Sequence, residues 1–98
     1  MNELQTIAEK TRPVFQKYGF RKVAIFGSRA RGDNTTKSDV DLLFSDRDRP
    51  LSFFQRQEAE EELEKILGVK VDLVPDTRVI ARMRPQIKRE LKIIYEGQ

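Results

Sequence analysis

Two aspartates separated by one residue, Asp39 and Asp41, have the types and spacing to do chemistry. They stand at the start of an apolar run, residues 42–44, that is typical of a buried strand. Because strand side chains alternate between the two faces of a sheet, both carboxylates should project from the same face. Two like charges so close together are unfavourable unless a cation neutralises them or one carboxyl is protonated, and Mg²⁺ prefers such hard oxygen ligands. The pair therefore predicts a site for divalent metal.

A third carboxylate, Asp72, lies in a similar apolar context. Residues 69–74 alternate between apolar and polar types before Pro75, which predicts another strand. If this strand neighbours the one that carries Asp41, the three carboxylates converge. Taken alone, Asp39 could be a loop-end cap and Asp72 an acid on the exposed face of an edge strand, so each depends on the others for its interpretation.

The segment Gly27–Gly32, with the sequence Gly-Ser-Arg-Ala-Arg-Gly, follows a short apolar run at residues 23–26. Glycine lets a backbone approach a ligand closely, and free N–H groups at a helix start favour anions. Ser28 can donate its hydroxyl to a phosphate oxygen, and Arg29 or Arg31 can add a charge-assisted bond to a triphosphate. An ordinary tight turn with two solvated arginines is the alternative. Because the segment precedes Asp39 and Asp41 at a fixed spacing, it predicts a phosphate cradle.

The elements that position these residues follow from hydrophobic spacing. Residues 4–18 have helical spacing that Pro13 interrupts, which predicts a helix that is kinked or restarted there. Thr11 could cap the second part, and Gly19 should end the helix near Tyr18. Residues 23–26 and 40–44 are then expected as two core strands, joined by the one-turn helix after Gly27 and by a polar loop.

Two further helices are predicted. One runs from Phe53 or Phe54 to Leu67, and the acidic residues at 58–64 on its other side are interpreted as a solvated face. The other has Pro85 near its start and an apolar stripe made of Met83, Ile87, Leu91 and Ile94. The order helix, strand, turn, strand, helix, strand, helix predicts an α/β (α+β) fold. We expect a single domain, residues 1–98, with a small mixed sheet of three or more strands flanked by helices.

Composition limits the chemistry further. The 98 residues contain neither cysteine nor histidine, which excludes disulfides, thiolate zinc sites and an imidazole base. No apolar stretch approaches the roughly 20 residues of a membrane span, and the first residues lack the pattern of a signal peptide, so we expect a cytoplasmic protein with no membrane partner. The net charge of +3 suits an anionic partner but is too small an excess to argue for nucleic acid.

The joint pattern resembles a known family. Gly27, Ser28, Gly32, Asp39 and Asp41 at their spacing, followed by Val71-Asp72-Leu73, are similar to the motifs of the minimal nucleotidyltransferase family of the DNA polymerase β superfamily. The similarity covers residues 22–74, and the flanking helices match the family's order. It implies a polymerase β-like nucleotidyltransferase fold.

The resemblance also implies roles for the motif residues. Gly27 and Ser28 would grip the β- and γ-phosphates of a nucleoside triphosphate, Asp39 and Asp41 would bind two Mg²⁺ ions, and Asp72 would bind the ion that activates an acceptor hydroxyl. Two metal ions can align attack on the α-phosphorus and neutralise charge on the leaving pyrophosphate without a histidine base.

Small members of this family are commonly encoded beside a HEPN-domain toxin and act as antitoxins by transferring AMP from ATP to a tyrosine of that toxin. The resemblance therefore implies a metal-dependent nucleotidyltransferase with ATP as substrate and a HEPN toxin as hetero-oligomeric partner. Two other interpretations stay open: a non-catalytic module that binds nucleotide or toxin, and a small nucleic-acid-binding protein. The intact acidic trio argues against the first, and the lack of an aromatic-rich binding strand argues against the second.

Overall fold

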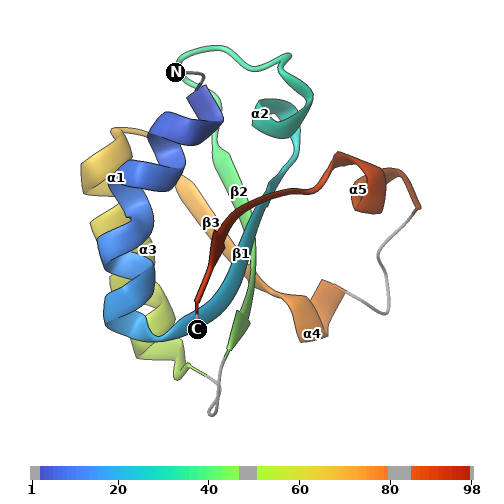
Figure 1. Ribbon diagram of the computed structural model, residues 1–98. Helices are drawn as coiled ribbons and strands as arrows, with labels where there is room; N and C mark the ends of the chain where they lie inside the picture. Colours follow the sequence, from blue (N-terminus) through green and yellow to red (C-terminus); the bar gives the residue numbers. More distant parts are fainter. Residues whose placement is uncertain (1–2, 47–50, 80–84, 98) are drawn as a thin grey trace.

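A four-stranded sheet forms the centre of the computed structural model, which describes residues 3–46, 51–79 and 85–97 (Figure 1). The strands are β1 (Phe20–Phe26), β2 (Val40–Asp46), β3 (Val71–Pro75) and β4 (Lys92–Glu96). Helices α1 (Glu3–Tyr18) and α3 (Phe53–Leu67) lie together against one face of the sheet. Three short helices complete the chain. α2 (Ser28–Arg31) follows β1, α4 (Asp76–Val79) follows β3, and α5 (Pro85–Glu90) precedes β4. The predicted mixed α/β architecture is confirmed.

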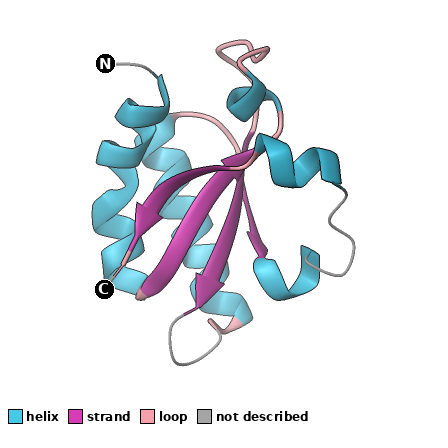
Figure 2. Cartoon of the chain, turned by 45° about the vertical axis from the view of Figure 1, so that its right-hand side comes forward, coloured by secondary structure: helices cyan, strands magenta, loops and turns pink. Residues whose placement is uncertain are grey.

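The sheet has the strand order β3-β2-β1-β4 and contains both kinds of pairing (Figure 2). β1 runs antiparallel to β2 and to β4, whereas β2 and β3 are parallel. The parallel pair needs a long crossover connection, and α3 supplies it. The end of β1 therefore lies beside the start of β2, as a shared site for their loops requires.

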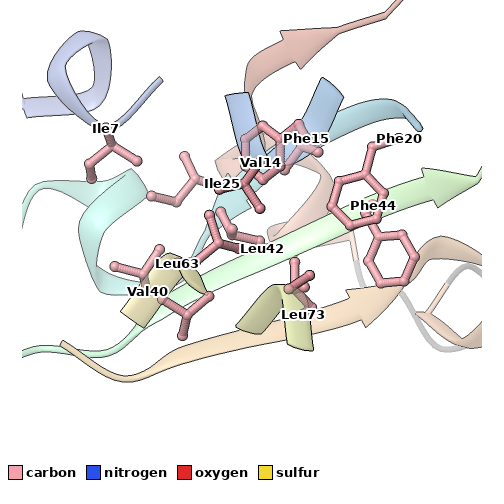
Figure 3. Close-up of a cluster of buried hydrophobic side chains, with 13 residues drawn as sticks. Ile7, Val14, Phe15, Phe20, Ile25, Val40, Leu42, Phe44, Leu63 and Leu73 are labelled. Atoms are coloured by element: carbon pink, nitrogen blue, oxygen red, sulfur yellow. The ribbon is translucent and has the colours of Figure 1, made fainter. Parts of the chain in front are cut away.

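The hydrophobic core fills the space between the sheet and the two long helices (Figure 3). Alternate side chains of each central strand point into it, which leaves the intervening side chains for the opposite face. On β2 the inward residues are Val40, Leu42 and Phe44, so Asp41 belongs to the opposite face. On β3 the inward residues are Val71 and Leu73, so Asp72 does too. The fold thus separates the core from the acidic face.

α1 is one continuous helix through Pro13, so the predicted restart with Thr11 as a cap is wrong. Thr11 is fully buried, and its hydroxyl donates to the carbonyl of Ile7, one turn earlier, at 2.6 Å. Packing of the apolar face of α1 against the sheet outweighs the hydrogen bond that proline removes. The predicted end is confirmed: the helix stops at Tyr18, and Gly19 follows with a positive φ of 72°.

Within the described ranges, no helix is long and apolar enough to cross a bilayer.

The C-terminal helix predicted from an apolar stripe is wrong in its extent. Met83 lies outside the described residues, α5 ends at Glu90, and residues 92–96 form β4 instead. These residues pair with the edge of β1 that lies opposite β2, which gives the backbone groups of both strands partners. The stripe Ile87, Leu91, Ile94 has helical spacing, but this long-range pairing overrides the local pattern.

The acidic side of α3 also differs from its prediction as a merely solvated face. The carboxylate of Glu64 accepts the backbone N–H of Val71 at 3.0 Å, and that of Glu60 accepts the N–H of Leu73 at 2.8 Å. Both N–H groups belong to β3, one of the two outer strands of the sheet, whose edge would otherwise be open for pairing with another chain. Two glutamates one helical turn apart therefore cover the edge of the strand that carries Asp72.

Candidate nucleotide and metal site

The end of β1 and the starts of β2 and β3 lie side by side, and the predicted motif residues lie at or next to them. Asp41 pairs in register with Asp72 on the parallel strand β3 and with Phe26 on β1. Gly27 follows Phe26 directly, and Asp39 precedes the first residue of β2. The condition for convergence, that the strands carrying Asp41 and Asp72 be neighbours, is thus met.

Gly27 lies directly against a carboxylate. Its backbone angles, φ 80° and ψ −156°, fall in a region that is essentially restricted to glycine. A Cβ atom built on Gly27 would come within 2.6 Å of Oδ2 of Asp41, far inside ordinary contact distance. The position therefore requires glycine for its conformation and also for the space that Asp41 occupies.

The turn after Gly27 closes as one turn of helix. The N–H of Arg31 donates to the carbonyl of Gly27 at 3.1 Å, and the N–H groups of Gly32 and Asp33 both donate to the carbonyl of Ser28, at 2.9 and 3.1 Å. Gly32 ends the turn in the left-handed conformation, with φ 84°. These bonds hold half-buried Ser28 at the junction between β1 and the loop that leads to Asp39.

The electrostatics identify Asp41 as the centre of the acidic group. Burial raises the pKa of its carboxyl, and the neighbouring carboxylates of Asp72 and Asp39 raise it further. A carboxyl with a raised pKa and two acidic neighbours suits a divalent cation, because the cation removes the repulsion that disfavours the ionised form. In the described parts of the chain no three acidic side chains approach closely enough to hold a metal ion as they stand, and repulsion between uncompensated carboxylates opposes closer approach.

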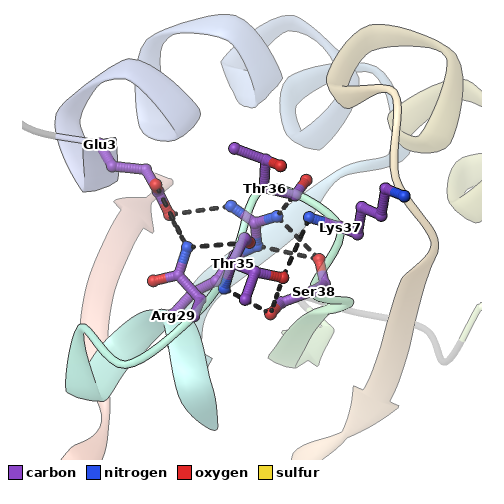
Figure 4. Close-up of polar contacts among 7 residues, drawn as sticks. Glu3, Arg29, Thr35, Thr36, Lys37 and Ser38 are labelled. Atoms are coloured by element: carbon purple, nitrogen blue, oxygen red, sulfur yellow. Dashed lines mark hydrogen bonds and ion pairs between the residues drawn. The ribbon is translucent and has the colours of Figure 1, made fainter.

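The two arginines of the turn have different surroundings. Arg31 is 43% exposed and pairs with Asp33 at 3.1 Å and with Glu90 of α5 at 3.3 Å. Arg29 is only 8% exposed and donates to the backbone of the following loop and to Glu3 of α1 (Figure 4). The sequence predicted a phosphate contact for either arginine, and Arg31 is the more exposed of the two, whereas Nε, Nη1 and Nη2 of Arg29 each donate to the loop or to Glu3.

Sequence reasoning did not single out the acids that meet these arginines. Glu3 and Glu90 lie 26 and 59 positions away from their partners along the chain. No local spacing links residues so far apart, and in a chain with 36% charged residues a single glutamate gives no signal of its own. Only the fold brings them to the turn.

Comparison with known proteins settles the family. The family described as "Nucleotidyltransferase domain" matches residues 8–95, nearly the whole chain. The chain belongs to this family. It is a nucleotidyltransferase, and the resemblance inferred from the motif is confirmed.

Individual relatives are similar over most of their length. A protein of Methanocaldococcus jannaschii provisionally named a protein adenylyltransferase is 36% identical, covering 97% of this chain and 96% of the relative. The protein adenylyltransferase MntA of Thermococcus cleftensis is 36% identical, covering 78% of this chain and 76% of the relative.

Solved structures agree with this assignment. A structure described as a minimal nucleotidyltransferase has a TM-score of 0.73 and 31% identity, covering 93% of this chain and 95% of the other. The complex of a tri-AMPylated Shewanella oneidensis HEPN toxin with its MNT antitoxin matches with a TM-score of 0.70 and 20% identity, covering 97% of this chain and 74% of the other. The second likeness is one of fold.

Proposed function

We propose that this nucleotidyltransferase transfers AMP from ATP to a tyrosine hydroxyl of a HEPN-domain toxin and thereby acts as its antitoxin. The observation that carries the proposal is the placement of Gly27 against Asp41, with Asp72 in register beside it. A glycine turn and a group of carboxylates are the two parts that transfer of a nucleotidyl group needs, one for the phosphates and one for the cations that accompany them.

Each motif residue has a distinct task in this proposal. Asp39, Asp41 and Asp72 would hold two Mg²⁺ ions, which supply charge neutralisation on the triphosphate and a lower pKa for the acceptor hydroxyl. Gly27 leaves room for the β- and γ-phosphates, Ser28 donates its hydroxyl to them, and Arg31 at the surface adds a positive charge. The exposed carboxylate of Asp72 would lie on the side from which the acceptor arrives.

The reaction itself exchanges one bond for another. The acceptor oxygen attacks the α-phosphorus in line with the bridging oxygen, the bond between the α-phosphorus and that oxygen breaks, and pyrophosphate leaves. The hydroxyl proton is lost to water. The acceptor comes from another molecule, and the S. oneidensis complex, in which a HEPN toxin carries AMP groups beside its MNT antitoxin, supports a protein acceptor of that class.

The proposal is tested by following labelled ATP. The purified chain is incubated with Mg²⁺, a purified HEPN-domain toxin and ATP labelled at the α-phosphate. We expect label on the HEPN protein, mapped to tyrosine by mass spectrometry, together with loss of its toxicity. ATP labelled at the γ-phosphate should transfer nothing, because that label leaves in pyrophosphate.

Matched acid variants complete the test. Asp41→Asn should lose transfer, whereas Glu61→Gln, which removes an exposed carboxylate from α3, should keep it. If the two proteins bind each other but no label reaches the toxin, the chain is a binding module and the proposal is wrong. Tight RNA or DNA binding that survives Asp41→Asn would instead favour a nucleic-acid-binding protein.

A further inference from the structure

The loop at residues 33–39 joins α2 to β2 and carries Asp39 at its end. Its sequence, Asp-Asn-Thr-Thr-Lys-Ser-Asp, contains no apolar side chain, and most of it is exposed. Such a loop cannot be ordered by hydrophobic burial, so hydrogen bonds must fix its position. The bonds that do so decide where Asp39 lies.

Arg29 supplies bonds at the critical point of this loop. Its Nε and Nη2 atoms both donate to the carbonyl of Ser38, at 3.2 and 2.7 Å, and Nη2 also donates to the carbonyl of Thr36 at 3.4 Å (Figure 4). The carbonyl of Ser38 belongs to the peptide bond that joins Ser38 to Asp39. Since that peptide is planar, a guanidinium that holds its oxygen also fixes the backbone entering Asp39.

The backbone is fixed on the other side of Asp39 as well. The N–H of Val40 donates to the carbonyl of Lys70 at 2.9 Å, two residues before Asp72 on β3. Asp39 therefore lies between two held peptide groups, one bound to Arg29 and one bound to the strand that carries Asp72. Together these bonds define its position relative to the other two carboxylates.

Glu3 anchors Arg29 to the first turn of α1. Its Oε1 atom accepts Nη1 of Arg29 at 2.9 Å, and its carboxylate also accepts the side-chain amide of Asn34 at 3.3 and 3.4 Å. One carboxylate thus contacts the beginning of the loop directly and its end through Arg29. A guanidinium that is 8% exposed also needs this negative partner to offset its desolvation.

We propose that Arg29, held by Glu3, is a positioning residue that sets Asp39 for metal binding, in place of the phosphate contact that the sequence predicted for it. This inference rests on the proposed function, because it takes Asp39 to be a metal ligand. The two roles are separable. A positioning residue changes the affinity for metal, whereas a phosphate ligand changes the affinity for nucleotide at saturating metal.

The first experiment measures metal binding without turnover. Arg29→Met and Glu3→Gln are titrated with Mn²⁺ by electron paramagnetic resonance in the presence of the β,γ-imido analogue of ATP. Loss of groups that orient metal ligands typically lowers metal affinity by about 10–100-fold, and we expect this range for Arg29→Met and a smaller loss for Glu3→Gln. Arg29→Lys should recover only part of the affinity, since an ammonium lacks the planar fork that holds one oxygen twice.

Amide hydrogen exchange provides a second readout on the metal-free protein. Removal of the guanidinium should speed exchange of the Val40 N–H by about tenfold while leaving the N–H of Leu73, which bonds to Glu60, unchanged. Gly19→Ala is the control for general destabilisation, because it strains the opposite end of β1. It should lower the melting temperature and leave Mn²⁺ affinity as in the wild type.

Three outcomes would overturn the inference. If Arg29→Met lowers the melting temperature without changing Mn²⁺ affinity, the arginine is structural only. If it leaves Mn²⁺ affinity intact and weakens the analogue at saturating Mn²⁺, it is a phosphate ligand. If the wild type binds no Mn²⁺, both this inference and the proposed metal site are wrong. Absence of AMP transfer by a wild type that binds Mn²⁺ normally would count against the proposed function alone.

Discussion

The two ends of β1 have opposite character. At its first residue, Phe20 is buried among aromatic rings, with ring centroids 5.6 Å from Phe15 and 4.9 Å from Phe44. At its last residue the chain turns through Gly27 against an acidic side chain whose ionised form is disfavoured. The same strand therefore joins a region that stabilises the fold to a region that opposes it electrostatically. The difference supports the proposed site at the second end, since packing alone would favour apolar side chains there.

Asp41→Asn, at the acidic end of β1, should give the largest difference between an effect on transfer and an effect on stability. Loss of one carboxylate from the metal site removes several kcal/mol of stabilisation of the reacting phosphate, so transfer should fall by about 10³-fold or more. Stability should respond in the opposite direction. Because the folded-state pKa of Asp41 is raised, the stability linked to its protonated form is present below the ordinary carboxyl pKa and is lost as the pH rises through the raised value.

With a chelator present and at a pH above the raised pKa of Asp41, the wild type has repulsion among its ionised carboxylates that the asparagine variant lacks. We expect the metal-free melting temperature of Asp41→Asn to equal or exceed that of the wild type, measured by circular dichroism. A sharp fall would contradict the claim that this acid is placed for function.

Phe20→Ala should give the reverse result at the other end of the strand. Removal of a fully buried phenylalanine costs about 3–5 kcal/mol of unfolding free energy. Transfer per folded molecule should stay close to that of the wild type, because the aromatic end does not contact the site. Denaturant unfolding and transfer at low temperature measure the two effects, and Phe20→Leu serves as a milder variant if the alanine protein fails to fold. A specific loss of rate in folded Phe20→Leu would show that the ends are coupled.

A pair of glycines compares the same substitution at both ends. Gly27→Ala forces a side chain into Oδ2 of Asp41 and into a strained backbone region, which costs about 1–3 kcal/mol before steric repulsion is added. It should also abolish transfer. Gly19→Ala has a similar positive φ but meets nothing within 4 Å, so it should cost about 1–2 kcal/mol and keep transfer. Chemical denaturation and the labelled-ATP assay compare them; equal transfer by both variants would remove Gly27 from the site.

The smallest expected effect is a pH dependence at the aromatic end. The hydrogen bond from Tyr18 to Glu62, with burial and the Glu62 charge adding to it, raises the pKa of the tyrosine to about 12 from 10.0. The stability that this bond contributes is therefore present below pH 10 and lost as the pH rises through about 12. Tyr18→Phe should be less stable than the wild type at neutral pH by an amount that shrinks above pH 10. A stability difference that stays constant across this range would be the contrary result.

Local patterns predicted the elements that carry the motif residues. The apolar run before Gly27 predicted a strand followed by a turn, and the run at residues 42–44 predicted the strand on which Asp41 lies. Local patterns could not predict the long-range contacts. Ile94 fits a helical stripe and a strand equally well, and pairing with the edge of β1 makes its segment a strand.

The contact partners of individual side chains could not be predicted from the sequence either. Glu60 and Glu64 have the spacing of a solvated helix face, yet they meet the backbone of β3 because of how α3 crosses the sheet. A guanidinium can bind a phosphate or a backbone carbonyl, and the path of the loop at residues 33–39 brings the carbonyl of Ser38 to Arg29. Residue type and spacing thus predict what a side chain can bind, and the fold selects its partner.

The proposed function requires that the acidic group at the end of β1 and the start of β2 binds nucleotide together with divalent metal. Isothermal titration calorimetry with the β,γ-imido analogue of ATP tests it directly, in Mg²⁺ and in chelator, for the wild type and Asp41→Asn. We predict binding to the wild type only with Mg²⁺, and affinity at least about tenfold weaker for the variant, in line with the loss of a metal ligand. Equal affinity for both proteins, or binding that does not depend on Mg²⁺, would contradict the proposed metal and nucleotide site.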